Sequence, residues 1–251
     1  MRGPIRRRTT NLPRIARVRV DSAAMDPDPR PIGRTTPPFE PRPVTLRGRL
    51  IRLEPLDERH RAGLHAIALQ EDTWRWTRHI VTTPAQFDGY LAQAFEAAGA
   101  GTEIPFVQVD VASGAPAGMT RFHSIERAHR RLEIGYTWLG VPYLGGGRNA
   151  EAKLLLLDHA FDTLGAHRVE FKTDALNARS QAALAAIGAT REGTLRRHVV
   201  LATAAFATRC TTRSPGTSGR GSARRSRHAW RRRRPPRTRR RGRSARPARP
   251  P

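Results

Sequence analysis

Three consecutive glycines, Gly145–Gly147, stand directly before a strongly helical stretch that runs to Phe161. Glycine lets main-chain N–H groups turn toward one point, because no Cβ atom obstructs them. The start of a helix adds free N–H groups and a partial positive charge. Together these features predict an anion site, most often for a phosphate. A loop that only needs positive φ angles would carry the same glycines, so the surrounding sequence has to decide.

The positive charge of the chain is concentrated at its two ends. The 251 residues carry a net charge of +25, yet residues 202–251 contain 17 Arg and no Asp or Glu, and residues 1–43 carry a net +6. Residues 44–201 carry only +2, which gives no indication of a nucleic-acid-binding domain. Lys153 and Lys172 are the only lysines beside 44 arginines, a bias that GC-rich codons produce.

Cysteine content and hydropathy exclude several classes of protein. Cys210 is the only cysteine, which excludes internal disulfides and cysteine-based metal sites, and we expect no metal. No apolar run reaches the length of a membrane span, and the basic N-terminus lacks the apolar core of a secretion signal. We expect a soluble, cytoplasmic monomer or homodimer without a membrane partner.

The composition divides the chain into three parts. Residues 1–43 are rich in Pro and Arg and are predicted to be disordered. A charge-balanced stretch begins at Met25, which is a candidate start, so that residues 1–24 would lie upstream of it. Residues 44–201 are predicted to form one domain, and residues 202–251 a disordered Arg-rich tail.

Hydrophobic periodicity places helices and strands in the central domain. Helical spacing predicts helices over residues 57–69, 84–99 and 177–187, and one from the glycine loop to residue 164. Alternation predicts strands over residues 46–54, 104–111, 118–125, 131–139, 167–173 and 193–201. In the fourth of these strands Leu132, Ile134, Tyr136 and Trp138 point one way and Glu133 the other. The order predicts an α/β fold: a mixed sheet with one strand–glycine loop–helix–strand crossover.

A dinucleotide-binding fingerprint is a rival interpretation of the glycines. Gly145, Gly147 and Ala150 have the required spacing, and Glu170 follows about twenty residues later. Against a nicotinamide cofactor, residues 141–143 separate the preceding strand from the glycines. The earlier strands also form an antiparallel meander, and no second crossover unit is present.

The segment "EIGYTWLGVPYLGGGRNAEAKLLLLDHAF" and the "TDALNARSQAALAAIGATREG" after it resemble the GNAT superfamily of N-acetyltransferases. The branch that acetylates the N-termini of ribosomal proteins is the most similar. The resemblance covers residues 44–201, and residues 136–193 are its most specific part. It implies a mixed sheet whose fourth and fifth strands splay apart to admit the pantetheine arm of acetyl-CoA. It also implies an amine as the acceptor.

The same resemblance assigns cofactor-binding residues. The pyrophosphate of acetyl-CoA would bind the loop formed by Gly145, Gly146, Gly147, Arg148 and Asn149. The side chain of Asn177 would hydrogen-bond the pantetheine arm, and backbone groups of Trp138 and Leu139 would pair with it like an added strand. The family's loop usually opens with Gln or Arg, where this chain has Pro142. We expect Arg148 to replace part of that contact.

Acetyl transfer to an amine needs a deprotonated nucleophile and a proton for the leaving thiolate. Glu133 is the first candidate for the base, although a charged residue on a solvated strand face is the alternative. His123 and His198 are secondary candidates. The family's usual proton donor is a Tyr, and Leu184 stands at that position. Ser180 is the nearest polar substitute, suited to orient a water molecule or the sulfur.

The acceptor site and the activity leave further alternatives open. Trp74 and Trp76 lie in the region that lines the acceptor site in the family, and either could instead belong to the core. Two other functions remain: a basic nucleic-acid-binding protein that acts through its tail, or a GNAT domain without activity. We expect the tail to bind polyanions without specificity.

The Arg-rich C-terminal sequence predicts an incomplete sheet. The family needs one more strand after residues 193–201, inserted beside the strand that contains Thr173, and we expect that strand to be missing. Permitted codons for residues 202–219, read from their third base, encode "DGRLRDTVHYSITRDEW", a turn and an alternating strand. Residues from Ala202 onward are therefore predicted to be read out of frame, which would make the chain less stable and impair its activity.

Overall fold

The computed structural model describes residues 38–200 and 206–214. The predicted start at Met25 and the predicted tail beyond Ser214 lie outside these residues. In chain order the helices and strands are β1 (Leu46–Arg47), β2 (Ile51–Pro55), α1 (Arg61–Ala68), α2 (Glu71–Trp74), α3 (Pro84–Gly99), β3 (Ile104–Asp110), β4 (Pro116–Glu126), β5 (Arg131–Leu139), α4 (Arg148–Asp158), β6 (Arg168–Asp174), α5 (Ala178–Ala186), β7 (Thr190–Val200) and β8 (Phe206–Ser214).

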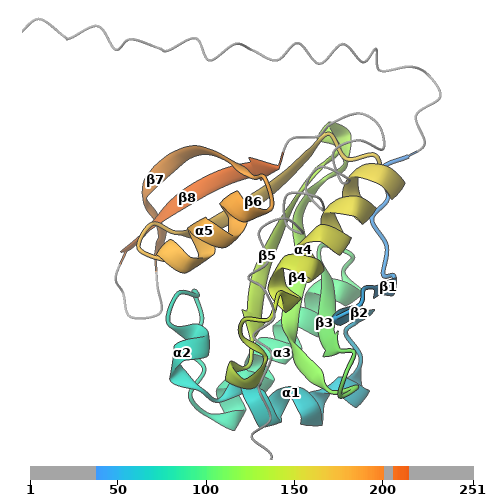
Figure 1. The fold of residues 1–251 in the computed structure, drawn as a ribbon, viewed down its shortest axis with the longest axis vertical. Coiled ribbons are helices and arrows are strands. Elements are labelled where there is room, and N and C mark those ends of the chain that lie inside the picture. Colours follow the sequence, from blue (N-terminus) through green and yellow to red (C-terminus); the bar gives the residue numbers. More distant parts are fainter. Residues whose placement is uncertain (1–37, 201–205, 215–251) are drawn as a thin grey trace, which may run out of the picture. The chain divides into compact units, whose positions relative to one another are not determined.

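The described strands form one mixed sheet in the order β1-β2-β3-β4-β5-β6-β8-β7 (Figure 1). Neighbouring strands run antiparallel except β5 and β6, which are parallel. A right-handed crossover through a helix is the usual way to join parallel neighbours, and α4 lies between β5 and β6 in the chain. The predicted α/β fold is therefore confirmed.

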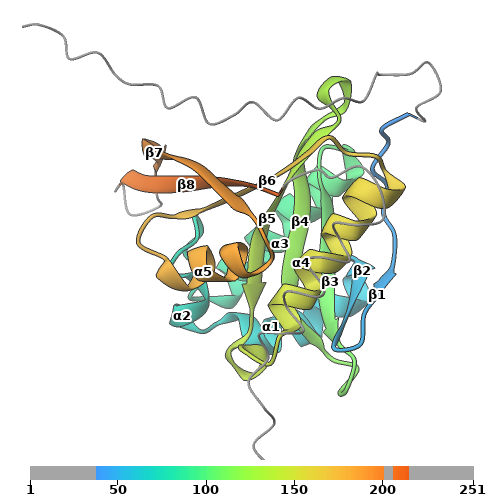
Figure 2. The same cartoon turned by 45° about the horizontal axis from the view of Figure 1, so that its top comes forward.

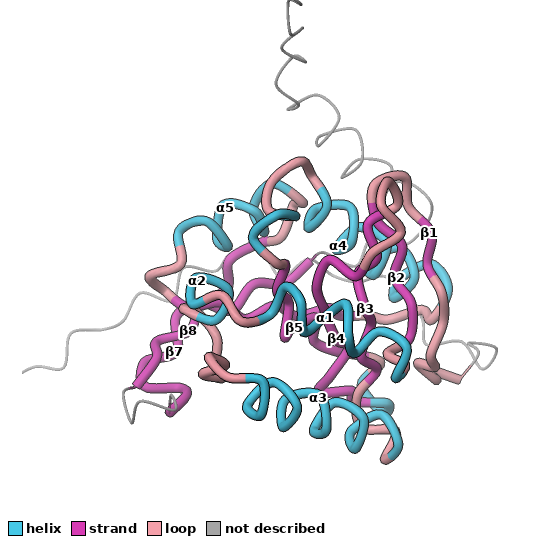
Figure 3. Tube along the Cα trace, turned by 90° about the horizontal axis from the view of Figure 1, so that it is seen from below, coloured by secondary structure: helices cyan, strands magenta, loops and turns pink. Residues whose placement is uncertain are grey.

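Helices cover both faces of the sheet (Figure 3). One core cluster joins strand side chains to α4 and α5, with Phe106, Phe122 and Leu156 fully buried. The other joins the opposite face to α1 and α3 and contains Phe87 and Trp138. Burying two apolar faces of one sheet is the arrangement that a mixed α/β sheet requires.

Local sequence explains where the first helices begin. The Asp57 carboxylate accepts a hydrogen bond from the backbone N–H of Arg59 at 3.0 Å, at the start of the short 3-10 turn that leads into α1. Thr83 and Gln86 form a capping box at the start of α3, with Pro84 as its first residue. Side chains that satisfy the free N–H groups of a helix fix its first turn, so both predicted starts are confirmed.

The packed part of the chain begins earlier than the predicted boundary at residue 43. Phe39 is 4% exposed and belongs to the core cluster under α4. The carbon of the Arg130 guanidinium lies 5.6 Å from the centre of the Phe39 ring. The prediction of disorder is wrong for residues 38–43, because one aromatic side chain there finds a buried site.

The alternation in β5 ends at a β-bulge. Tyr136 has a φ of 51°, and the register between β4 and β5 shifts at this point. Leu132 and Ile134 pack in the cluster under α4, whereas Trp138 packs in the cluster with α1 and α3. The predicted common face of these side chains is therefore wrong beyond Ile134, because an extra residue in one strand turns the following side chains to the other face.

Strand β8 occupies the position predicted to be empty. Its backbone pairs with β6 from Val169↔Ser214 to Asp174↔Arg209, and its other edge pairs with β7. The expectation that the fold lacks this strand is wrong for Phe206–Ser214. Three β-branched residues favour an extended backbone there, namely Thr208, Thr211 and Thr212. Among the described strands, β7 is left as an edge strand of the sheet.

Strands β5 and β6 part after a short paired stretch. They pair only at Arg131↔Arg168, Leu132↔Val169 and Glu133↔Glu170, although β5 continues to Leu139 and β6 to Asp174. Figures 1 and 2 show β6 leaving β5 toward β8 and β7. The splay that the sequence predicted between these strands is confirmed.

Gly118 offers a test of how closely β4 and β5 approach beside the bulge. A Cβ atom at this position would lie 2.1 Å from the carbonyl oxygen of Trp138. Gly118→Ala is therefore expected to lower the free energy of unfolding by about 3 kcal/mol. Gly89→Ala in α3 is the control, since a Cβ atom there meets nothing within 4 Å and alanine favours a helix by about 0.5 kcal/mol or more. Urea unfolding of both variants tests this; equal stabilities would contradict it.

Candidate active site

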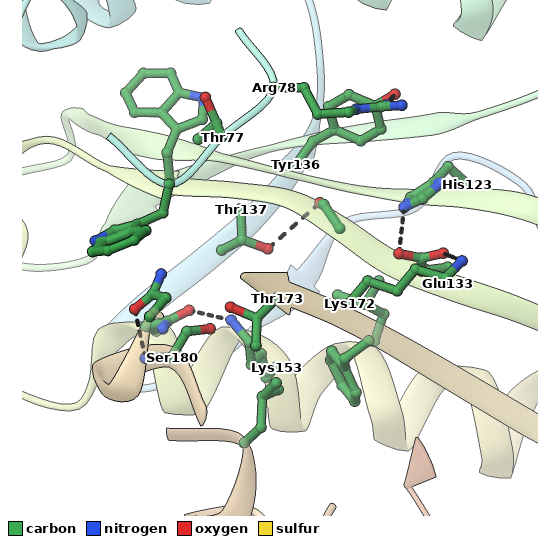
Figure 4. A pocket seen from close by; sticks show the side chains of 18 of the residues that line it. Thr77, Arg78, His123, Glu133, Tyr136, Thr137, Lys153, Lys172, Thr173 and Ser180 are labelled. Atoms are coloured by element: carbon green, nitrogen blue, oxygen red, sulfur yellow. Dashed lines mark hydrogen bonds and ion pairs between the residues drawn. The ribbon is translucent and has the colours of Figure 1, made fainter. Parts of the chain in front are cut away.

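A cavity of about 1160 Å³ opens where β5 and β6 part (Figure 4). The glycine loop, α4, α5 and the end of β7 line one part of it, and β4, β5 and the segment after α2 line the other. Of the predicted site residues, Arg148 is the one that does not line it. We call the part beside the glycine loop the loop half, and the part around Glu133 and Tyr136 the strand half.

The glycine loop has the backbone that its sequence predicts. Gly145, Gly146 and Gly147 have φ angles of 77°, 61° and 91°, in the region that other residues rarely adopt. Gly147 is the N-cap residue of α4, and all three glycines line the cavity. The free N–H groups of the first helical turn therefore begin at the wall of the cavity, as an anion site requires.

The Arg148 side chain was expected to contact the pyrophosphate, but it does not line the cavity. Its Nε donates a hydrogen bond to the Asp110 carboxylate at 2.7 Å, and its guanidinium lies over the Tyr143 ring. Burial would raise the pKa of Asp110, but its hydrogen bonds with Arg148 and Ser113 outweigh burial and lower that pKa. The Arg148 side chain is thus committed to a carboxylate at the end of β3.

A buried lysine lies beside the first turn of α4. Lys153 is 7% exposed and lines the cavity, and its Nζ donates a hydrogen bond to Oδ1 of Asn149 at 2.5 Å. The two residues are four positions apart, so they share one face of the helix. Burial lowers the pKa of Lys153 to about 8. Thr173 and Ser180, labelled with Lys153 in Figure 4, also line the cavity.

Asn177 and Ser180 face the cavity from the start of α5. The Asn177 side-chain oxygen accepts a hydrogen bond from the backbone N–H of Ser180 at 3.0 Å, which caps the helix. This contact uses the amide oxygen and leaves the amide NH₂ of Asn177 for another partner. Leu184, one turn after Ser180, is 2% exposed and lines the cavity with its apolar side chain.

Glu133 sits in a cluster of charged groups rather than on a solvated face. It is 5% exposed, and its carboxylate accepts a hydrogen bond from Lys172 Nζ at 2.7 Å. His123 Nε2 lies 3.5 Å from the other carboxylate oxygen. Burial would raise the pKa of Glu133, but the interactions with His123 and Lys172 outweigh burial and lower that pKa. Glu133 is therefore an ionised, buried carboxylate at the wall of the cavity.

Aromatic and cationic side chains surround the rest of the strand half. The hydroxyl of Tyr136 accepts a hydrogen bond from Arg78, and the guanidinium of buried Arg121 lies 4.3 Å from the centre of the Tyr136 ring. Arg121 also pairs with Glu103 at 2.8 Å. Burial and the nearby Arg78 lower the pKa of His79 to about 4, so His79 is neutral at pH 7.

The two predicted tryptophans differ in their surroundings. Trp74 is 5% exposed, donates a hydrogen bond to the carbonyl of Ala68 at 2.7 Å and packs on other aromatic rings of the core. Trp76 is only partly buried and lies beside the Arg75 guanidinium. Both line the cavity, and His198 lines it from β7. Trp74 therefore has a core role as well as a position in the cavity wall.

Sequence reasoning missed the two lysines of the site. Lys153 and Lys172 both line the cavity. The signal was present in the composition, because 44 of the 46 Lys and Arg residues are Arg and only these two positions keep a lysine. Lysine and arginine differ in shape, in hydration and in how readily the pKa shifts on burial. The only two lysines of the chain therefore line one cavity.

Comparison with known proteins assigns the domain. The acetyltransferase (GNAT) domain family matches residues 50–190. The Bacillus subtilis (strain 168) protein named "Putative ribosomal N-acetyltransferase YdaF" is 32% identical over 83 residues, which are 33% of this chain and 45% of that protein. The match to this curated relative thus spans less than half of its length.

Solved structures agree with this assignment. A GCN5-related N-acetyltransferase from Brucella melitensis is 26% identical, with a TM-score of 0.70 over 77% of this chain and 88% of that one. Mycobacterium smegmatis RimJ in complex with CoA-disulfide has the same fold, at 24% identity and a TM-score of 0.63 over 76% of this chain and 96% of that one. No helix in residues 38–200 is long and apolar enough to cross a membrane.

Lys172→Met would leave the buried Glu133 carboxylate with His123 alone. Because pairing lowers the pKa of Glu133, its contribution to stability is complete above the ordinary value of 4.5 and is lost as pH falls through the lower folded-state pKa. We expect a loss of about 2 kcal/mol at about pH 7 and much less at about pH 3. Urea unfolding at both pH values measures this, with exposed Arg49→Met as control. A pH-independent loss would contradict it.

Proposed function

The chain belongs to the GNAT acetyltransferase family, and we propose that it transfers the acetyl group of acetyl-CoA to a primary amine, either a protein N-terminal α-amine or a small amine. The single observation that carries this proposal is the cavity between β5 and β6. A glycine loop at a helix start lies at one side of it, and a buried carboxylate, Glu133, at the other. We also propose that the protein acts in the cytoplasm.

The residues in the loop half fit the cofactor. Gly145–Gly147 and the first turn of α4 offer backbone N–H groups to a pyrophosphate without Cβ obstruction. Beyond the three paired positions, the facing edges of β5 and β6 form no hydrogen-bonded ladder with each other. Backbone groups of Trp138 and Leu139 are proposed to pair with the pantetheine arm there, together with the free amide NH₂ of Asn177. Acetyl-CoA supplies the activated acetyl thioester when bound.

Glu133 is proposed to receive the proton of the acceptor amine. An α-amine has a pKa of about 7.7–8.0 and a lysine side chain about 10.4, so deprotonating the α-amine at neutral pH costs about 3 kcal/mol less. The lowered pKa of Glu133 makes it a weak base, which suits the more acidic α-amine. His123, beside the carboxylate, is placed to share the proton, directly or through a water molecule.

Ser180 is proposed to orient a water molecule or the cofactor sulfur. It lines the cavity one turn before Leu184, whose apolar side chain donates no proton. A hydroxyl is a poor acid at neutral pH, so Ser180 is assigned orientation rather than proton donation. Figure 4 places Ser180 on the side of the cavity opposite Tyr136.

A protein N-terminus is the acceptor that the strand half fits best. Trp76 and Tyr136 offer partly exposed aromatic surface for a peptide chain. Arg78 adds a cation near the hydroxyl of Tyr136, where it can donate to backbone carbonyl groups. The name of the Bacillus subtilis relative, "Putative ribosomal N-acetyltransferase YdaF", supports this choice.

Gly147→Val tests the glycine loop. Valine strongly disfavours the φ of 91° found at Gly147. We expect the dissociation constant of acetyl-CoA to rise at least about tenfold. Gly114→Val is the matched control, because Gly114 has a φ of 72° in the turn between β3 and β4, outside the cavity lining. Isothermal titration calorimetry measures both; unchanged affinity in Gly147→Val would remove the loop from the cofactor site.

Glu133→Gln tests the proposed base. The amide keeps the size of the carboxylate but takes up no proton, so turnover should fall about 100-fold. Acetyl-CoA affinity should change by less than about twofold, since Glu133 lies in the strand half. Mass spectrometry of an acetylated N-terminal peptide gives the rate, and calorimetry gives the affinity. Glu126→Gln, at an exposed carboxylate of the same cavity, is the control. Normal turnover in Glu133→Gln would assign this residue a structural role only.

A further inference from the structure

Lys153 is the buried cation of this cavity that the proposed chemistry does not use. It is 7% exposed, and its ammonium has three N–H donors. One of them contacts Oδ1 of Asn149 at 2.5 Å. Within the described part of the chain no carboxylate forms an ion pair with Lys153. A buried ammonium without an anionic partner is costly, and burial accordingly lowers the pKa of Lys153 to about 8.

The position of Lys153 relates it to the glycine loop. Long side chains on a helix lean toward its N-terminus, and the contact with Asn149 shows that Lys153 does so. Its ammonium therefore lies beside the first turn of α4, whose N-cap is Gly147. Gly147, Asn149 and Lys153 line the same cavity. A phosphate held by the N–H groups of this turn would meet a cation at the side of the helix.

Within the described residues, the loop from Pro142 to Asn149 places no other side-chain cation in the cavity lining. Pro142, three residues before Gly145, offers no side-chain donor. Arg148 is committed to Asp110 at 2.7 Å and does not line the cavity. Lys172 lines the strand half, where it pairs with Glu133. Among the described residues, Lys153 is thus the lysine of the cavity that forms no ion pair with a carboxylate.

We infer that Lys153 is a cofactor-recognition residue whose ammonium pairs with the pyrophosphate of acetyl-CoA, in place of the side-chain donor missing from the loop. The inference rests on the proposed function. An ammonium near two negative charges forms charge-assisted hydrogen bonds, which are stronger than neutral ones. The pairing also gives a role to a buried lysine in a chain with 44 arginines, since the lysine ammonium is a more compact charge than a guanidinium.

Lys153→Met and three ligands test the inference. Methionine keeps the length and the apolar stem but removes the charge, so the fold should be as stable as before or more stable. The dissociation constant of acetyl-CoA should rise at least about tenfold. ADP, which carries a pyrophosphate without the pantetheine arm, should lose affinity by a similar factor. S-acetylpantetheine, which has the arm without the pyrophosphate, should bind Lys153→Met and the original protein equally. Calorimetry measures all three.

Arg49→Met, which removes an exposed cation outside the cavity lining, is the control, and it should change acetyl-CoA affinity by less than about twofold. Three results would overturn the inference: equal acetyl-CoA affinity in Lys153→Met and the original protein, equal losses for acetyl-CoA and S-acetylpantetheine, or an equal loss in Arg49→Met. Lys153→Gln, whose amide can still donate to Asn149, gives the same comparison without charge if the methionine variant does not fold. Failure of the original protein to bind acetyl-CoA would instead refute the proposed function.

Discussion

The parting of β5 and β6 after three paired positions is the constraint on which the rest of the site depends. Two parallel neighbours that stayed paired would close the sheet and leave no room for a ligand between them. The bulge at Tyr136 turns β5 beyond this point, and β8 pairs with the far edge of β6. The backbone of β6 therefore keeps hydrogen-bond partners in β8 where it has parted from β5. The opening thus does not leave the N–H and C=O groups on both edges of β6 without partners.

The two halves of the cavity differ in their charged groups. In the strand half, Glu133 is held ionised by Lys172 and His123. In the loop half, Lys153 donates a hydrogen bond to the neutral amide of Asn149, and the glycine loop adds N–H groups. One half thus contains a compensated carboxylate, suited to proton transfer, and the other an uncompensated cation and helix start, suited to an anion. The same domain can hold a phosphorylated cofactor and an amine without placing like charges together.

Much of the fold could be predicted because local signals agree with it. The Thr83 cap, Pro84 and Gly145–Gly147 each fix a backbone conformation through their own chemistry. The bulge could not be predicted, since Tyr136 carries no residue-level preference for positive φ. Strand β8 was missed because arginine content outweighed the β-branched residues in its sequence. The commitment of Arg148 to Asp110 joins residues 38 positions apart, a contact that no local pattern reveals. The reading frame beyond Ala202 stays a prediction, which resequencing of the gene would decide.

A crystal structure of the full chain with acetyl-CoA tests the central claim most directly. We expect one cofactor between β5 and β6, with its pyrophosphate on the N–H groups of Gly145–Asn149 and within hydrogen-bond distance of Lys153, and with its pantetheine arm beside Trp138 and Leu139. A cofactor bound elsewhere on the molecule, or in this gap with its pyrophosphate away from the glycine loop, would contradict the proposed cofactor site.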